Sequence, residues 1–139
     1  MDSQKNDDAA RCFSASMNGE IFEIFISGEY TMESLVTMKE KINDMAVAEK
    51  VKKMLVDVRD TKADIGYSET YLLAMMTPTY FDKIPTAIVH SPEHSHLARF
   101  YEDLINKNGI PMKFFTDIDD ARKWLKNIRQ KHQSFHLSK

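Results

Sequence analysis

Charged side chains gather at the end of an apolar run, residues 54–58, that the sequence predicts as a buried strand. Asp57 interrupts this run, and Arg59 and Asp60 follow it. Side chains two residues apart in a strand point to the same side. We therefore interpret Asp57 and Arg59 as an ion pair, with a catalytic role for Asp57 as the weaker alternative. Carboxylates can divide general acid and base work only when their environments differ.

Three histidines form the other group that could do chemistry. His90 ends a second predicted strand, and His94 and His96 lie in the first turn of the helix expected after it. Neutral imidazoles bind divalent metals. However, side chains two apart on a helix point about 200° away from each other. We expect a polar loop and a helix start here, with no metal and no cofactor.

A third group of charged residues follows the last predicted strand and is entirely acidic: Asp117, Asp119 and Asp120. Asp at a helix start accepts free backbone N–H groups, so we interpret these residues as caps. No Gly-x-Ser-x-Gly elbow occurs, and four isolated glycines build no phosphate-binding loop. We therefore expect no enzyme; an enzyme using Asp57, Arg59 and His90 ranks last among the alternatives.

The strongest functional signal is the segment 67–81, which is apolar on both sides of its predicted helix. Only one side of such a helix can pack on a sheet, and methionine adapts to irregular partners. Pro78 should end or kink the helix near Met76. The segment therefore predicts an interface or a pocket wall. The side chains of this segment that we expect to contact a partner are Tyr67, Ser68, Tyr71, Met75, Met76 and Tyr80. The expected binding site also includes four residues at the ends of the neighbouring strands, Asp57, Arg59, Asp60 and His90.

A repeated alternation of strand and helix must position these groups. Three short apolar runs, residues 54–58, 86–90 and 112–116, are each followed by a helical pattern, near 67–82, 92–108 and 118–129. Strand candidates at 11–16 and 21–26 flank Asn18-Gly19, a strong hairpin signal, and a further helix should start after Thr31. The sequence predicts an α/β fold: a mixed sheet of about five strands with four helices. An antiparallel amino-terminal hairpin lies at an edge, three parallel βα units follow, and their loops gather at one rim.

Composition sets broad limits on the class of protein. The chain has 139 residues, 42% of them apolar and 29% charged, with a net charge of −2. We expect one domain at 10–130, between a disordered tail at 1–9 and a flexible polar tail at 131–139. The lone Cys12 and the lack of a long apolar run indicate a cytoplasmic protein without a transmembrane segment. Basic stretches that include Lys53 and Arg122 look like solvated helix faces, so we expect no nucleic-acid binding.

Order and spacing of three segments, 54–59, 85–90 and 112–125, also carry a family resemblance. The last of them joins a strand, an acidic cap and an Ala-x-x-Trp-Leu helix, here Ala121, Trp124 and Leu125. Over residues 11–127 the chain resembles the SpoIIAA-like branch of the STAS superfamily, the anti-sigma-factor-antagonist fold. The resemblance implies protein partners, and in some members a serine switched by phosphorylation after the internal strand. Here the Asp-Ser-Ser-Gly pattern is absent and Ile65 or Gly66 is nearest that position, which argues against the switch.

Two functional hypotheses follow from the helix at 67–81 and the adjoining loop at 60–66. The first is a non-enzymatic, STAS-like regulatory domain that binds a protein partner or its own copy as a homodimer. The alternative is a small-molecule or lipid carrier with an apolar pocket under this helix, in which Tyr71, Met75 and Tyr80 touch the ligand.

Overall fold

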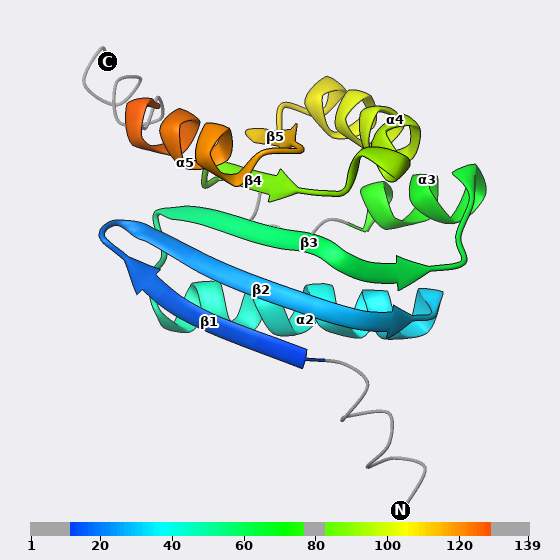
Figure 1. Ribbon diagram of the computed structural model, residues 1–139, viewed down its shortest axis with the longest axis horizontal. Helices are drawn as coiled ribbons and strands as arrows, with labels where there is room; N and C mark the ends of the chain where they lie inside the picture. Colours follow the sequence, from blue (N-terminus) through cyan, green and yellow to red (C-terminus); the bar gives the residue numbers. More distant parts are fainter. Residues whose placement is uncertain (1–11, 77–82, 129–139) are drawn as a thin grey trace, which may run out of the picture.

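The computed structural model describes residues 12–76 and 83–128, and its elements alternate as the sequence predicts (Figure 1). The strands are β1 (Cys12–Asn18), β2 (Ile21–Tyr30), β3 (Lys53–Ala63), β4 (Thr86–Val89) and β5 (Met112–Phe115). The helices are α2 (Met32–Ala48), α3 (Tyr67–Met75), α4 (Ser95–Lys107) and α5 (Ile118–Asn127), with a short 3₁₀ helix, η2 (Pro92–His94), before α4. The expected tails at 1–9 and 131–139 and the segment 77–82 lie outside the described residues.

All five strands form one sheet in the order β1-β2-β3-β4-β5. β1 is antiparallel to β2, and the other three neighbouring pairs are parallel. The hairpin turns at Asn18-Gly19, where Gly19 has a φ of 64° that suits a residue without a Cβ. The predicted α/β fold is therefore confirmed, including the hairpin at one edge and three parallel βα units in one sheet.

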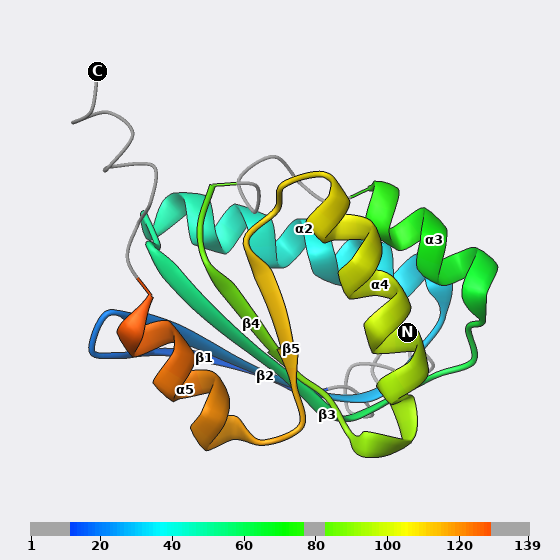
Figure 2. The ribbon, with the colours of Figure 1, turned by 90° about the horizontal axis from the view of Figure 1, so that it is seen from above.

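The helices divide unequally between the two faces of the sheet. α2, α3 and α4 lie on one side, and α5 lies on the other (Figure 2). Alternation along β3 sends Met54 and Val56 into the larger core under the three helices, and Leu55 into the smaller core under α5. Ala121 and Leu125 of α5 are fully buried in that smaller core. Each face therefore has its own core, and a side chain's position in a strand decides which one it joins.

β3 is longer than the sequence predicts, because residues 60–63 continue it instead of opening a loop. They pair with residues 27–30 of β2 after a register shift between Phe25 and Ser27. β4 pairs only with residues 54–57, so β3 runs past the end of β4. Asp60 and Lys62 are exposed there while Thr61 and Ala63 are half-buried. The polar composition of this segment, which suggested a loop, reflects an exposed strand face.

Candidate functional site

An apolar cavity of about 220 Å³ lies between the sheet and the three helices that cover its larger core. Val58, Thr61 and Ala63 of β3 line it where that strand extends beyond β4, and His90 lines it just after β4 ends. The cavity is therefore at the carboxyl ends of parallel strands, the place where α/β sheets bind ligands. Its further lining residues, drawn from strands and helices, include Ile26, Leu35, Met38, Leu73, Tyr101 and Phe114.

A lysine fixes the helix that roofs this cavity. Lys39 of α2 donates from Nζ to the carbonyl oxygen of Leu73 at 2.7 Å and to the hydroxyl of Tyr101 at 2.6 Å. The three residues come from α2, α3 and α4, so one ammonium group joins all three helices over the cavity. The carbonyls near a helix end lack intrahelical partners. Lys39 adds a charged hydrogen bond to one of these end carbonyls, that of Leu73, which among the described residues otherwise accepts only a 3.2 Å bond from the backbone N–H of Met76.

The outer side of α3 exposes an unusual amount of apolar surface. Thr70, Leu73 and Ala74 are buried toward the rest of the protein. In α3 and at its C-cap, five large apolar side chains are between 45% and 53% exposed: Tyr67, Tyr71, Leu72, Met75 and Met76, which we call the α3 face. An exposed apolar patch of this kind is typical of an interaction site.

Comparison with the predicted contacts separates the two sides of α3. Tyr71 and Met75, which we expected to touch a ligand in the pocket, do not line the cavity; Thr70 and Leu73 do. The prediction is wrong for these two residues, because the helix turns them to the opposite side. Ser68 is exposed in the first turn of α3, and Tyr80 lies outside the described residues.

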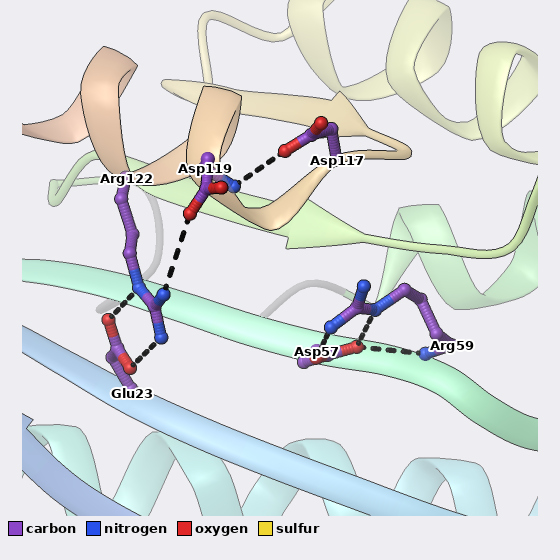
Figure 3. A network of polar contacts seen from close by, with 6 residues as sticks. All are labelled: Glu23, Asp57, Arg59, Asp117, Asp119 and Arg122. Carbon is purple, nitrogen blue, oxygen red and sulfur yellow. Dashed lines mark hydrogen bonds and ion pairs between the residues drawn. The ribbon is translucent and has the colours of Figure 1, made fainter.

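On the other face of the sheet, Asp57 and Arg59 form the predicted ion pair (Figure 3). Arg59 donates from Nε to Asp57 Oδ1 at 3.0 Å and from Nη2 to Oδ2 at 2.7 Å, and its backbone N–H also reaches Oδ1 at 3.1 Å. The hydrogen bonds to Asp57 raise the pKa of Arg59 above its usual value. Asp57 and Asp60 also line a groove of about 180 Å³ with Cys12 and Ser14.

A second ion pair on this face was not predicted. Arg122 of α5 donates from Nε to Glu23 Oε2 at 2.8 Å and from Nη2 to Oε1 at 2.9 Å (Figure 3). Glu23 is buried in β2, and the hydrogen bonds from Arg122 lower its pKa below the usual range. Asn18 adds a hydrogen bond to Oε2 at 3.1 Å. Arg122 is therefore a structural partner of the sheet, and its assignment to a solvated face is wrong.

Two further predictions about charged groups need correction. Lys53 is buried and donates from Nζ to the carbonyl oxygen of Leu125 at 2.7 Å, so it holds the end of α5 instead of lying in solvent. Asp117 caps α5, accepting from the backbone N–H groups of Asp119 and Asp120 at 2.7 and 3.3 Å. Asp119 and Asp120 are thus capped residues and not caps themselves.

Two solved structures share this arrangement. An anti-sigma factor antagonist from Mycobacterium paratuberculosis superposes with a TM-score of 0.58 at 12% identity, covering 86% of this chain and 97% of its own. An uncharacterised protein of the DUF3478 family with a SpoIIAA-like fold, from Shewanella loihica PV-4, gives a TM-score of 0.51 at 17% identity, covering 84% and 93%. This chain has the SpoIIAA-like fold. No protein-family model and no curated protein matches its sequence.

The SpoIIAA-like sheet separates the residues of the enzyme hypothesis. Asp57 pairs in register with Val89, and both lie on the α5 side. His90 is the next residue along and faces the other way, lining the cavity beside Phe114 with ring centroids 6.1 Å apart. Asp57, Arg59 and His90 therefore do not converge on one reacting atom, and the hypothesis that joins them is wrong.

The described parts of this SpoIIAA-like chain contain neither a cluster of metal ligands nor a helix that could span a membrane. Across residues 12–76 and 83–128, no three His, Cys, Asp or Glu side chains are grouped so that they could hold a metal ion. His94 Nδ1 lies 2.9 Å from the hydroxyl of Ser91, and His96 lies beside the ring of Tyr67. None of the helices described combines the length and the apolar character needed to cross a bilayer.

The sequence indicated some of these groups and not others. His90 and the apolar character of α3 stood out in the sequence, whereas the roles of Lys39, Thr70 and Leu73 did not. The cavity draws single residues from several elements, so no spacing in the sequence marks it. The helical spacing of apolar residues in α4, which include Leu97 and Tyr101, could be recognised in the sequence. Such spacing does not tell whether a residue packs in the core or lines a cavity.

Proposed function

We propose that this chain is a non-enzymatic regulatory domain that acts by binding a protein through the α3 face, and that the partner is its own copy. The observation that carries the proposal is the set of five half-exposed large apolar side chains, four on the nine-residue helix α3 and the fifth, Met76, at its C-cap. Fully burying a large apolar side chain is worth roughly 1.5–3 kcal/mol. A half-exposed one retains roughly half of that for an interface, so five together supply a substantial driving force.

The composition of the α3 face supports a self-associating contact. A twofold contact places the same patch of each copy against the other, and therefore needs a patch that is compatible with itself. The α3 face contains two tyrosines, one leucine and two methionines, with no like charges to repel one another. Tyr67 is held edge-on against Phe100 of α4 at a centroid distance of 5.0 Å, which preorganises part of the surface.

The comparison supports a regulatory role, and the cysteine content supports a cytoplasmic location. The similar structure from Mycobacterium paratuberculosis is described as an anti-sigma factor antagonist, a regulator by its name. The one cysteine, Cys12, is free and exposed, and free thiols suit a reducing compartment. We therefore place the proposed regulatory activity in the cytoplasm.

Sedimentation-velocity ultracentrifugation tests the self-association. Leu72→Glu puts a charge in the middle of the α3 face without loss of helix propensity, and we expect it to convert a dimer to a monomer. Val47→Glu is the matched control, because Val47 is 49% exposed on α2 and Leu72 is 51% exposed on α3. A monomeric wild type would refute the homodimer. Equal effects of both substitutions would refute the α3 face as its interface.

A second candidate function is carriage of a small apolar molecule in the cavity beneath α3. The observation that favours it is the 220 Å³ of apolar space at the carboxyl ends of the strands. Empty apolar cavities of comparable size can bind small hydrocarbons. Native mass spectrometry of freshly purified protein tests carriage: a copurified small molecule supports it, and bare protein in repeated preparations counts against it.

A further inference from the structure

We propose that the cavity beneath α3 is a binding site for a small apolar molecule that carries one hydroxyl group, and that His90 accepts the hydrogen bond from that hydroxyl. The inference rests on the carrier function proposed above and adds the chemical class of the ligand. It is carried by the hydrogen bonds of three of the polar side chains that line the cavity, His90, Thr61 and Thr70; Tyr30, His94 and Tyr101 also line it.

His90 offers one unoccupied ring nitrogen. Its side chain is buried, with the residue only 8% exposed, and its Nδ1 lies 2.9 Å from the backbone carbonyl oxygen of Ser91. A carbonyl oxygen can only accept, so the proton of the neutral ring is on Nδ1 and Nε2 carries a lone pair. Within the described part of the chain, Nε2 has no hydrogen-bond partner. A ligand that displaces water from the cavity must donate to this acceptor or leave it unpaired at a cost in binding free energy.

The hydroxyl groups of the two threonines also donate their hydrogen bonds to protein carbonyls. Thr61 donates its hydroxyl proton to the carbonyl oxygen of Val58 at 2.7 Å, and Thr70 donates to that of Gly66 at 2.8 Å. Each therefore presents only lone pairs to a molecule in the cavity. Together with His90 they provide three hydrogen-bond acceptors on the cavity lining, which favour a ligand that donates a hydrogen bond. A carboxylate, which only accepts hydrogen bonds, cannot pair with these three acceptors.

The ammonium group of Lys39, which joins the helices that cover the cavity, does not reverse the preference for a ligand that donates a hydrogen bond. The Nζ of Lys39 is engaged by Leu73 and Tyr101. Tyr101 accepts from Lys39, and because an ammonium cannot accept in return, the tyrosine keeps a proton that it can donate. A hydroxyl group both donates and accepts, so it can satisfy His90 and still receive a hydrogen bond. An alcohol or phenol thus fits the polar groups better than a pure donor or a pure acceptor.

The volume of the cavity limits the number of atoms in the ligand. An apolar cavity of about 150 Å³ holds benzene, with six carbon atoms. On that scale, the 220 Å³ available here suits a molecule of about nine non-hydrogen atoms. 4-Ethylphenol has that size, and 4-ethyltoluene replaces its hydroxyl with a methyl group of nearly the same volume. The pair therefore isolates the contribution of the hydroxyl.

The experiment measures dissociation constants of both probes by NMR titration for wild type, His90→Phe and Ala98→Leu. We expect His90→Phe to weaken 4-ethylphenol relative to 4-ethyltoluene by about tenfold, the effect of leaving one buried polar group unpaired. Ala98 lines the cavity and is buried, so Ala98→Leu should weaken both probes. In wild type alone, 4-ethylphenol should shift the ¹⁵N resonance of His90 Nε2 and 4-ethyltoluene should not. This readout needs no variant to fold.

The possible outcomes separate the two claims. If both probes bind in the cavity, but with the same ratio in wild type and His90→Phe and no Nε2 shift, the hydroxyl preference is overturned and carriage of apolar molecules stands. If neither probe binds wild type, both the ligand class and the carrier function are overturned. If Ala98→Leu leaves both affinities unchanged, the probes bind elsewhere and the cavity assignment is overturned.

Discussion

Replacing Arg122 with methionine tests how α5 is held on the sheet. Arg122→Met keeps an apolar stem of similar length and removes both hydrogen bonds to Glu23, at 2.8 and 2.9 Å. The carboxylate of Glu23, with only 5% of its side chain exposed, then loses its charged partner. We expect a folded protein with a lower free energy of unfolding and a less protected α5.

The size of this effect follows from the burial of the two groups. Removing one partner of a buried ion pair costs about 3–5 kcal/mol. Asn18 still donates to Glu23, and one third of the Arg122 side chain is exposed, so water reaches the pair. We therefore expect a loss at the lower end, about 3 kcal/mol. For a chain of this size that lowers the melting temperature by about 10 °C.

The effect of this substitution should depend on pH. Arg122 holds the pKa of Glu23 below its usual range, while an unfolded glutamate titrates near 4.3. A lowered pKa in the folded state stabilises the protein above the unfolded pKa, and that stabilisation disappears as the pH falls through the folded pKa. In Arg122→Met, acid relieves the buried charge instead. The difference between the two proteins should therefore shrink from pH 6 to pH 3.

Urea unfolding at pH 6, 4.5 and 3 measures these differences, with Lys123→Met as the control. Lys123 is exposed on the same helix, and we expect its replacement to change stability by less than about 0.5 kcal/mol. A loss below about 1 kcal/mol for Arg122→Met at pH 6 would refute the buried-pair argument, because exposed pairs contribute that much. A difference independent of pH would refute the role of Glu23.

Two further substitutions test the attachment of single helices. Lys39→Met removes the charged hydrogen bonds to Leu73 and Tyr101 and should lower the free energy of unfolding by about 1.5–3 kcal/mol. Hydrogen exchange should show the loss of protection first in α3. Unchanged exchange in α3 would contradict the role of Lys39 in holding this helix. Asp117→Ala removes the cap of α5 and should cost about 1 kcal/mol, measured by thermal unfolding, with Asp117→Asn retaining most of the stability.

The fold could be predicted because its determinants are local in the sequence. Asn18-Gly19 permits the positive φ that the hairpin needs, and the strands and helices each carry their own hydrophobic period. The Asp57–Arg59 pair was predictable for the same reason, since its members are two residues apart on one strand. The extent of β3 was not, because pairing with β2 decides it and not the composition of residues 60–63.

The contacts that close the site could not be predicted because they join distant segments. Glu23 and Arg122 are 99 residues apart, and Lys39 and Tyr101 are 62 apart. In the sequence, each basic residue sits on a helix with other charged residues and is indistinguishable from a solvated one. Only the crossovers of the sheet, which bring α5 within side-chain reach of β2 and α2 within side-chain reach of α4, bring these pairs together. Long-range polar contacts therefore need the fold before they can be read.

The two proposed functions do not compete for the same atoms, because they use opposite sides of α3. Leu73 faces the cavity and Leu72, its neighbour in sequence, lies on the exposed face. Leu72→Glu should therefore leave 4-ethylphenol binding unchanged, and Ala98→Leu should leave self-association unchanged. A ligand can alter self-association only if it binds two positions of α3 with different affinity, and the coupling must then be equal in both directions. If only one of these substitutions changes the other function, that substitution disturbed folding. If ligand binding and self-association change each other equally, α3 transmits occupancy of the cavity to its outer face.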